Sequence, residues 1–142
     1  KTLFPYTTLF RSTNALSGVR ALCQFLQDAP DSPVHKYTGP GQDPDAVFDL
    51  RAIFQQAHHT LAIESMPALL LPQKGRYGLR DYDKVFCPTL KNGPDIFDLR
   101  GVNREQGALV VVRPDQYIAH VLPLNAHQAL ANFFDGFMLP RY

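Results

Sequence analysis

The side chains in this chain that could do nucleophilic or redox chemistry are its two cysteines, Cys23 and Cys87. They form no C-x-x-C pair, the spacing typical of disulfide-exchange enzymes. A reactive thiol also needs an electropositive and partly open setting. Cys23 instead falls within the apolar stripe of a predicted helix, where a cysteine is typically a small buried residue. Two thiols far apart in the sequence suit a reducing compartment at least as well as a disulfide.

The histidines are the next candidates, because imidazole can bind a metal ion or move protons. His58 and His59 are adjacent. Adjacent side chains diverge on a helix or a strand, so these two are predicted to be a polar pair in a loop. His120 and His127 have no cysteine or carboxylate beside them at a familiar ligand spacing. The sequence therefore predicts no metal site.

The overall composition excludes several classes of function. The 142 residues carry 14 basic and 13 acidic side chains, a net charge of +1, with no basic run that would indicate nucleic-acid binding. The longest apolar stretch, PALLLP, is closed by Pro67 and Pro72, far short of the roughly 20 residues of a membrane span. We expect a cytoplasmic domain with many turns that binds neither nucleic acid nor membrane.

The elements that would position these side chains begin with a helix in SGVRALCQFLQDAP. Ser17 can cap its start, and Pro30 and Pro33 stop it. Its apolar stripe is Val19, Leu22, Cys23 and Leu26. HKYTGPGQDPD then reads as a polar surface loop.

AVFDLRAIFQQ has the alternation of a strand. Val47 and Ile53 face away from the main apolar side, so both faces are predicted to be partly covered, as in a sheet with helices on it. The alternating apolar residues are Phe48, Leu50, Ala52 and Phe54. The stretch from 57 to 94 has no sustained period; it predicts short irregular elements, with a helical turn at 81–86. Asp95 can cap a short helix that ends at Gly101.

The clearest pattern is the hairpin ALVVVRPDQYIAHVLPL, in which two β-rich runs flank a turn. Pro114 and Asp115 suit a type I turn. A helix follows in NAHQALANFFDGFML, where Asn125 and Gln128 have capping-box spacing. Its apolar stripe is Leu130, Phe133, Phe134 and Phe137. The sequence thus predicts an α/β fold that ends as a thioredoxin-like fold does, in a hairpin and a helix.

GALVVVRPDQYIAHVLPL, FDLRAIFQQ and GRYGLRDYDKVF together resemble the C-terminal region of flavin-dependent phenol hydroxylases, the family of phenol 2-monooxygenase and 3-hydroxybenzoate 4-monooxygenase. The resemblance runs from about Leu16 to Met138. Its most specific part is Val110–Tyr117, which contains the turn residues Arg113, Pro114, Asp115, Gln116 and Tyr117.

The resemblance implies a thioredoxin-like domain that packs on flavin and substrate domains and takes part in homodimer formation, away from catalysis. Phe133, Phe134 and Phe137 are then candidate packing or interface residues. It also implies that the whole protein binds FAD, takes hydride from NADPH and hydroxylates a phenolic ring. Those steps need residues upstream of Thr13, because this chain has no G-x-G-x-x-G that would follow a strand and open a helix. We therefore expect the fragment alone to be inactive, with no cofactor, metal or catalytic residue of its own.

Two other functions compete with this interpretation. One is a free-standing thiol-dependent oxidoreductase on a thioredoxin fold. Against it, the place of the usual C-x-x-C reads NALSGVR, and the place of the usual proline before the closing hairpin reads NREQGAL. The other is a free-standing domain that binds a small molecule.

The first twelve residues stand apart from the rest. Residues 2–12, TLFPYTTLFRS, are identical to the translation of a common short-read sequencing adapter. We therefore predict that residues 1–12 are an artefact, that residues 13–142 are the domain, and that the natural first strand is missing. On this interpretation Thr7–Arg11 forms a makeshift strand or a loose tail, and in either case it pairs weakly because Pro5 cannot donate to a ladder.

Overall fold

The computed structural model describes residues 4–11, 15–89, 91 and 93–140. Single turns of 3-10 helix are labelled η. The elements, in chain order, are β1 (Phe4–Arg11), α1 (Ala15–Asp28), α2 (Pro33–Tyr37), β2 (Phe48–Gln55), η1 (His58–Thr60), η2 (Ile63–Ser65), η3 (Ala68–Leu70), β3 (Gln73–Lys74), β4 (Leu79–Arg80), β5 (Val85–Phe86), α3 (Ile96–Leu99), β6 (Ala108–Val112), β7 (Ile118–Leu122) and α4 (His127–Asp135).

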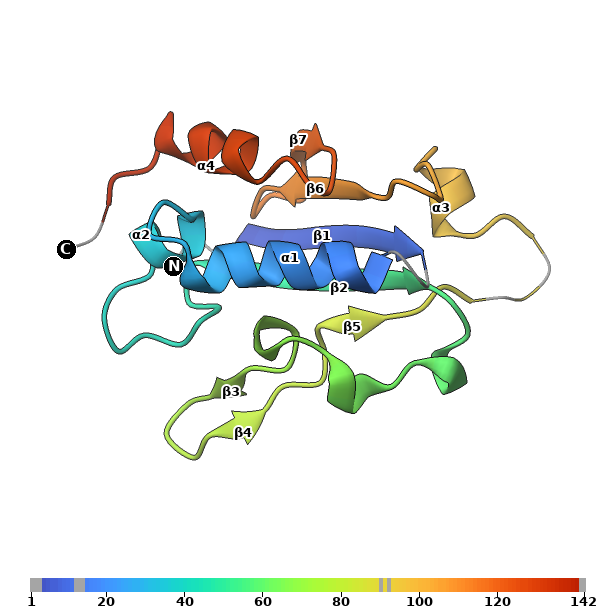
Figure 1. The fold of residues 1–142 in the computed structure, drawn as a ribbon, viewed down its shortest axis with the longest axis horizontal. Helices are drawn as coiled ribbons and strands as arrows, with labels where there is room; N and C mark the ends of the chain where they lie inside the picture. Colours follow the sequence, from blue (N-terminus) through green and yellow to red (C-terminus); the bar gives the residue numbers. More distant parts are fainter. Residues whose placement is uncertain (1–3, 12–14, 90, 92, 141–142) are drawn as a thin grey trace.

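The main sheet has the strand order β5-β2-β1-β6-β7 (Figure 1). β1 and β2 are parallel, and the chain crosses between them through α1 and α2. β6 pairs antiparallel with β1, and β7 pairs antiparallel with β6 as the second arm of a hairpin. The predicted α/β class with a closing hairpin and terminal helix is confirmed, and this order is compatible with a thioredoxin-like fold.

A strand forms at the place of the predicted makeshift strand. β1 begins at Phe4, three residues earlier than Thr7, and lies between β2 and β6. That this strand stands in for a missing natural one stays a prediction. β1 pairs with β2 along its whole length and with β6 from Tyr6 to Leu9. Pro5 is tolerated because it lies near the strand's start, outside the stretch that pairs with β6.

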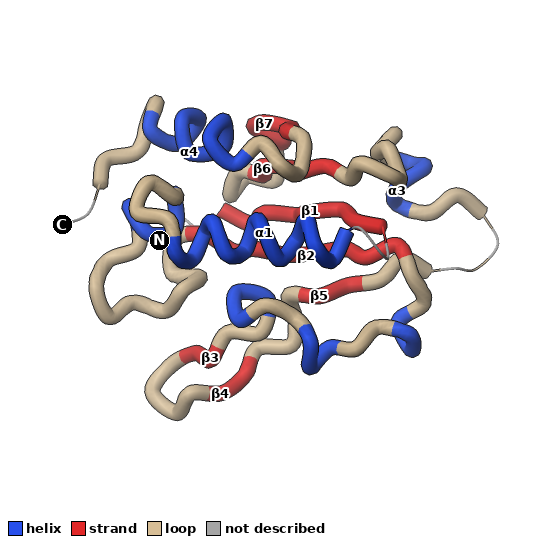
Figure 2. Tube along the Cα trace, in the orientation of Figure 1, coloured by secondary structure: helices blue, strands red, loops and turns tan. Residues whose placement is uncertain are grey.

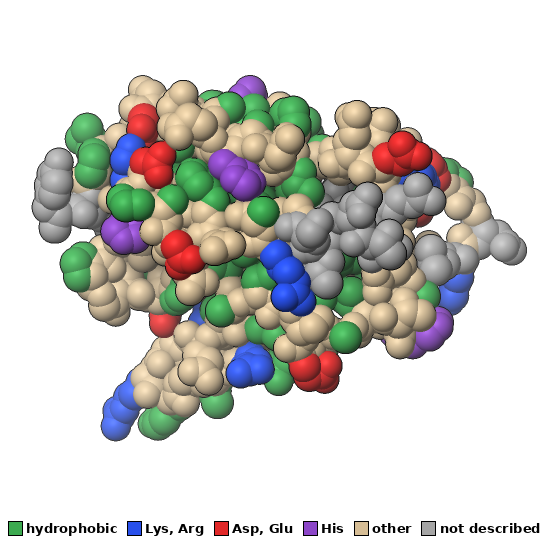
Figure 3. Space-filling view, viewed as in Figure 1, with side chains coloured by type: hydrophobic (Ala, Val, Ile, Leu, Met, Phe, Trp, Pro, Cys, Tyr) green, Lys and Arg blue, Asp and Glu red, His purple; other side chains and the backbone are tan. Residues whose placement is uncertain are grey.

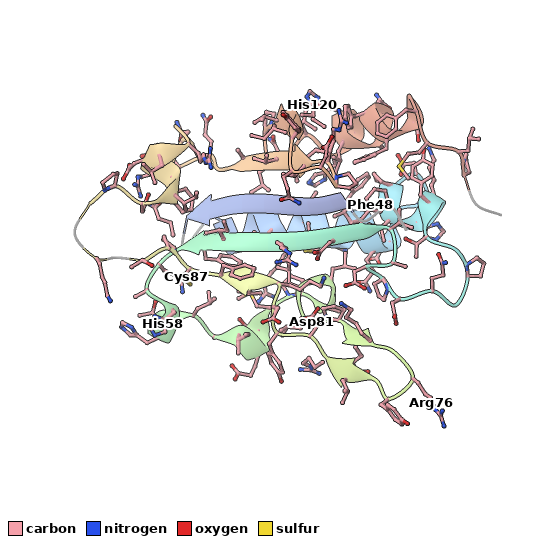
Figure 4. All side chains as sticks on the ribbon, turned by 180° about the vertical axis from the view of Figure 1, so that it is seen from behind. Phe48, His58, Arg76, Asp81, Cys87 and His120 are labelled. Carbon is pink, nitrogen blue, oxygen red and sulfur yellow. The ribbon has the colours of Figure 1, made fainter. Side chains whose placement is uncertain are left out.

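The long helices pack on one face of this sheet (Figures 1 and 2). β2 alternates strictly between buried and half-buried residues, as its sequence predicts. Phe48, on the buried face, contacts the ring of Phe134 in α4 at 5.1 Å between centroids. Leu26 of α1 and Leu109 of β6 line the same small internal cavity as Phe48. Seen from behind, β1 and β2 lie in front of α1 with no helix over them (Figure 4).

The stretch after β2 is irregular, as predicted, but the helical turn expected at 81–86 is wrong. Residues 85 and 86 form β5, which pairs parallel with β2 at Ala52 and Ile53. The local sequence could not indicate this strand, because its two residues are held by the neighbouring strand. A small separate hairpin, β3–β4, precedes it, with Gly75 and Gly78 in the left-handed region that its tight turn requires.

The helix ends agree only in part with the sequence. Asp95 caps α3 with a full capping box, and Gly101 follows at φ +62°, as predicted. α1 begins at Ala15, so the position of Ser17, predicted to precede the helix, lies within its bounds. Asn125 is not the N-cap of α4, because the helix begins at His127 and its N-cap is Ala126. Among the described residues, none of the helices has the length and apolar character needed to cross a membrane.

Candidate interaction surface

The two thiols lie where nucleophilic chemistry is disfavoured. Cys23 is 2 % exposed within α1, and its burial raises the pKa of the thiol to about 12. Cys87 follows β5, is half-buried, and burial raises its pKa as well. Both are free cysteines. Because only the thiolate is an effective nucleophile, neither residue is poised for exchange near neutral pH.

The four histidines considered above lie at three separate places. His58 and His59 lie exposed in η1, at the opposite edge of the sheet from His120 (Figure 4). His120 stacks on Phe133 at 4.8 Å between centroids, and His127 stacks on Phe25 at 5.1 Å. Within the described ranges, no three His, Cys, Asp or Glu side chains are grouped so that they could hold a metal ion.

One buried charge has no signal in the sequence. Lys84, only 2 % exposed, places its ammonium against Asp49 and at 2.7 Å from Asp45. Asp81 lies 3.7 Å from the same nitrogen. Lys74 bridges Asp45 and Asp81 at 2.6 and 2.9 Å. We call these five residues the Lys84 cluster.

The Lys84 cluster is a network of ion pairs in which each charge lies against an opposite one. Burial on its own would raise the pKa of Asp45, but hydrogen bonds from Lys74 and Lys84 outweigh it and lower that pKa. The backbone N–H of Asp83, followed by Lys74, lowers the pKa of Asp81. The lowered pKa values keep Asp45 and Asp81 ionised at neutral pH, and the carboxylate of Asp49 pairs with the ammonium of Lys84. The cluster joins β2 to the β3–β4 hairpin and to the approach to β5.

The hairpin turn closes around the predicted residues. Gln116 donates its backbone N–H to the carbonyl of Arg113 at 2.9 Å, and Arg113 donates its own to the carbonyl of Tyr117 at 2.8 Å. Gln116 has φ +70°, so a turn containing Pro114 and Asp115 is followed by one left-handed residue, a common three-residue hairpin loop. The Asp115 carboxylate pairs with the Arg113 guanidinium at 2.7 Å. Tyr117 is 71 % exposed.

The three phenylalanines of the last helix have different environments. Phe134 is fully buried, Phe133 is half-buried under His120, and Phe137 is 56 % exposed just beyond the end of α4. The predicted stripe is therefore buried at Leu130 and Phe134, half-buried at Phe133 and exposed at Phe137. Figure 3 shows apolar side chains along the upper part of the molecule, over α4 and β7.

A bulge in the hairpin creates an apolar surface on the sheet face away from the helices. The register shifts between Val111 and Val112, so that His120 and Ile118 pair with neighbouring residues of β6 and Ala119 is extra. Ile118 thereby shares a face with Val112, as Val121 does with Val110. Ile118 and Val121 are 60 % and 54 % exposed. We call Val110, Val112, Ile118 and Val121 the β6–β7 outer face.

Sequence reasoning missed the β6–β7 outer face because a bulge breaks the two-residue period. Strict alternation would have put Ile118 on the same side as His120. One sequence signal could have indicated the surface: the stretch from Gln116 to Phe134 contains no Lys, Arg, Asp or Glu. An exposed edge strand without charge is unusual, because proteins commonly protect such edges with charged side chains.

Comparison with known proteins matches this chain to one family. The model for "Phenol hydroxylase, C-terminal dimerisation domain" matches residues 3–142. A "3-hydroxybenzoate 4-monooxygenase" of Comamonas testosteroni is 60 % identical over 123 residues, 86 % of this chain and 19 % of that protein. The "FAD-dependent monooxygenase terD" of Aspergillus terreus (strain NIH 2624 / FGSC A1156) is 33 % identical over 109 residues, 75 % of this chain and 18 % of that protein. The chain thus spans about a fifth of the length of these relatives.

Proposed function

The chain belongs to the phenol hydroxylase C-terminal dimerisation domain family, and on that premise we propose that it holds together two copies of an FAD-dependent aromatic hydroxylase. The observation that carries this proposal is the β6–β7 outer face, which exposes apolar side chains on a strand without charged residues. The two thiols, by contrast, have raised pKa values and are poorly suited to redox chemistry. Such surfaces mark interaction sites.

In the whole protein, the catalytic steps belong to residues outside this chain. We propose that those residues would bind FAD, which would supply the capacity to take hydride from NADPH and to hydroxylate a phenolic ring; the names of the relatives support FAD and an aromatic substrate. The domain contributes association with a second copy and packing on the catalytic domains. The proposed compartment is the cytoplasm, where free Cys23 and Cys87 stay reduced.

A chimaera tests this function. The matching C-terminal segment of the Comamonas testosteroni 3-hydroxybenzoate 4-monooxygenase is replaced by this chain, and mass, flavin content and hydroxylation of 3-hydroxybenzoate are measured. We expect a flavin-loaded, active dimer, because 60 % identity preserves the packing of the domain. The truncated relative without the segment is expected to lose the dimer.

The isolated chain is the matched control for flavin binding. It is expected to stay colourless after purification with added FAD, because it lacks the glycine-rich turn that lets a backbone approach a pyrophosphate. A stoichiometric yellow complex would contradict the proposal that FAD is bound by residues outside this chain. A truncated relative that remains fully dimeric would contradict the role in association.

A further inference from the structure

We infer that a second copy of this chain docks on the β6–β7 outer face, so that the two sheets pack face to face around a two-fold axis. This inference rests on the proposed function and specifies which surface carries it. The surface is defined by Val110, Val112, Ile118 and Val121, and no helix among the described residues covers this side of the sheet (Figure 4).

The first argument is exposure. Ile118 and Val121 leave more than half of their side chains in water, although the bulge turns both to the same side of the hairpin. Val110 and Val112 beside them are half-buried. Two sheets that pack on such faces interdigitate their side chains and form an apolar core about 10 Å thick. Contact with a second copy would remove from water the β-branched surface that the fold leaves exposed.

The second argument is charge, which does not oppose a second copy, the partner that the dimerisation-domain family indicates. In a two-fold contact each residue near the axis faces its own counterpart, so a charged residue there would face a like charge. β7 and the residues that follow it as far as Phe134 carry no charged side chain. The centre of the proposed contact therefore contains no charge that would repel its own copy.

The surroundings of the β6–β7 outer face are charged but locally balanced. On β2, two strands away, Arg51 pairs with Asp49 at 2.9 Å. At the hairpin turn, Arg113 pairs with Asp115 at 2.7 Å. An apolar centre with a polar rim is the usual composition of an interface. Because each of these described charges has an opposite partner, these residues do not oppose the approach of a second copy.

The exposed side chain of Phe137 marks an alternative docking surface, and it also provides a matched control. It is 56 % exposed, close to the values of Ile118 and Val121, but it follows α4 and packs with Phe134, on the helix-covered side of the sheet. An aspartate at Phe137 changes exposed apolar area and charge as an aspartate at Ile118 does. Only the second would lie in the proposed contact.

The test compares Ile118→Asp, Val121→Asp and Phe137→Asp with the unmodified 142-residue chain by sedimentation equilibrium, with circular dichroism as the check of folding. We expect Ile118→Asp and Val121→Asp each to weaken association by about a hundredfold, because each change places two carboxylates near the axis of one dimer. Phe137→Asp is expected to change it by less than about threefold. The milder pair Ile118→Ser with Val121→Ser replaces the aspartate variants if those fail to fold.

The outcomes separate the inference from the proposed function. An unmodified chain that never associates contradicts both the inference and the role in association. A dimer that survives both the Ile118 and the Val121 variants, or that dissociates only with Phe137→Asp, overturns the inference and leaves the role in association standing. Variants that stay dimeric but no longer pack on the catalytic domains in the chimaera also overturn it, by assigning the face to a contact within one copy.

Discussion

Lys84→Met is expected to lower the free energy of unfolding by about 3–5 kcal/mol, the usual effect of removing one partner from a buried ion pair. Methionine keeps most of the apolar stem, so the loss isolates the ammonium group. Without it, Asp45 and Asp49 lose a shared partner although they are only 13 % and 14 % exposed. Urea denaturation measures the difference.

The matched control is Lys36→Met, which removes a partly exposed ion pair with Asp135. Surface pairs of this kind contribute roughly 0–1 kcal/mol, so this variant is expected to remain close to the unmodified chain. Equal stability of Lys84→Met and Lys36→Met would show that the buried ion pairs of the Lys84 cluster do not stabilise the fold.

The effect of Lys84→Met should also depend on pH in a defined direction. The pKa values of Asp45 and Asp81 are lowered in the folded chain from the ordinary value of 3.8. A lowered pKa means that the ionised groups stabilise the fold fully above about 3.8, and that this contribution is lost as the pH falls through the lowered values. The difference between the two proteins should therefore shrink in acid.

Phe134→Ala is expected to destabilise the chain by about 3–5 kcal/mol, because it leaves a cavity where a fully buried ring was. The ring of Phe134 contacts Phe48 of β2 at 5.1 Å and Phe133 at 5.2 Å between centroids, so it joins the last helix to the sheet. Thermal or urea unfolding, with the chain at one fixed concentration, measures the loss.

Phe137→Ala is the control for that prediction. Its side chain is 56 % exposed, and substitutions at such positions usually change the free energy of unfolding by less than about 0.5 kcal/mol. Because its ring also contacts the ring of Phe133, at 5.3 Å between centroids, the loss in the free energy of unfolding can be somewhat larger than this. A Phe137→Ala variant as unstable as Phe134→Ala would contradict the placement of the helix described here.

The sequence predicted the elements whose periodicity is long and regular. The stripe of α1 and the alternation of β2 are both buried as expected, because amphipathic patterns of that length fit only one placement against a core. The α3 cap was equally predictable, because Asp95 can bond the N–H groups of its own helix without help from distant residues. Local chemistry decided all three.

The features that sequence reasoning missed depend on partners that lie far away in the chain. β5 has only two residues and exists because β2 offers it a parallel ladder. Lys84 is buried because Asp45 and Asp49 meet it from 39 and 35 residues away. The bulge at Ala119 depends on how β7 aligns with β6. No local pattern marks contacts of this kind.

The first strand was predicted in part. A makeshift strand was expected at Thr7–Arg11, and β1 runs from Phe4 to Arg11, paired with β2 along its whole length and with β6 from Tyr6 to Leu9. The predicted weakness of this pairing, which rests on Pro5 and a modest β propensity, stays a prediction. That residues 2–12 are an adapter translation stays a prediction, and the genomic sequence ahead of Thr13 would check it.

The mass of the 142-residue chain in solution tests the central claim most directly. Sedimentation equilibrium over a range of concentrations is expected to give a species of about twice the 16.0 kDa of one chain, with the fraction of dimer rising as concentration increases. A mass of 16.0 kDa that stays constant at every concentration, for a chain that circular dichroism shows to be folded, would contradict the claim that this domain associates with a second copy.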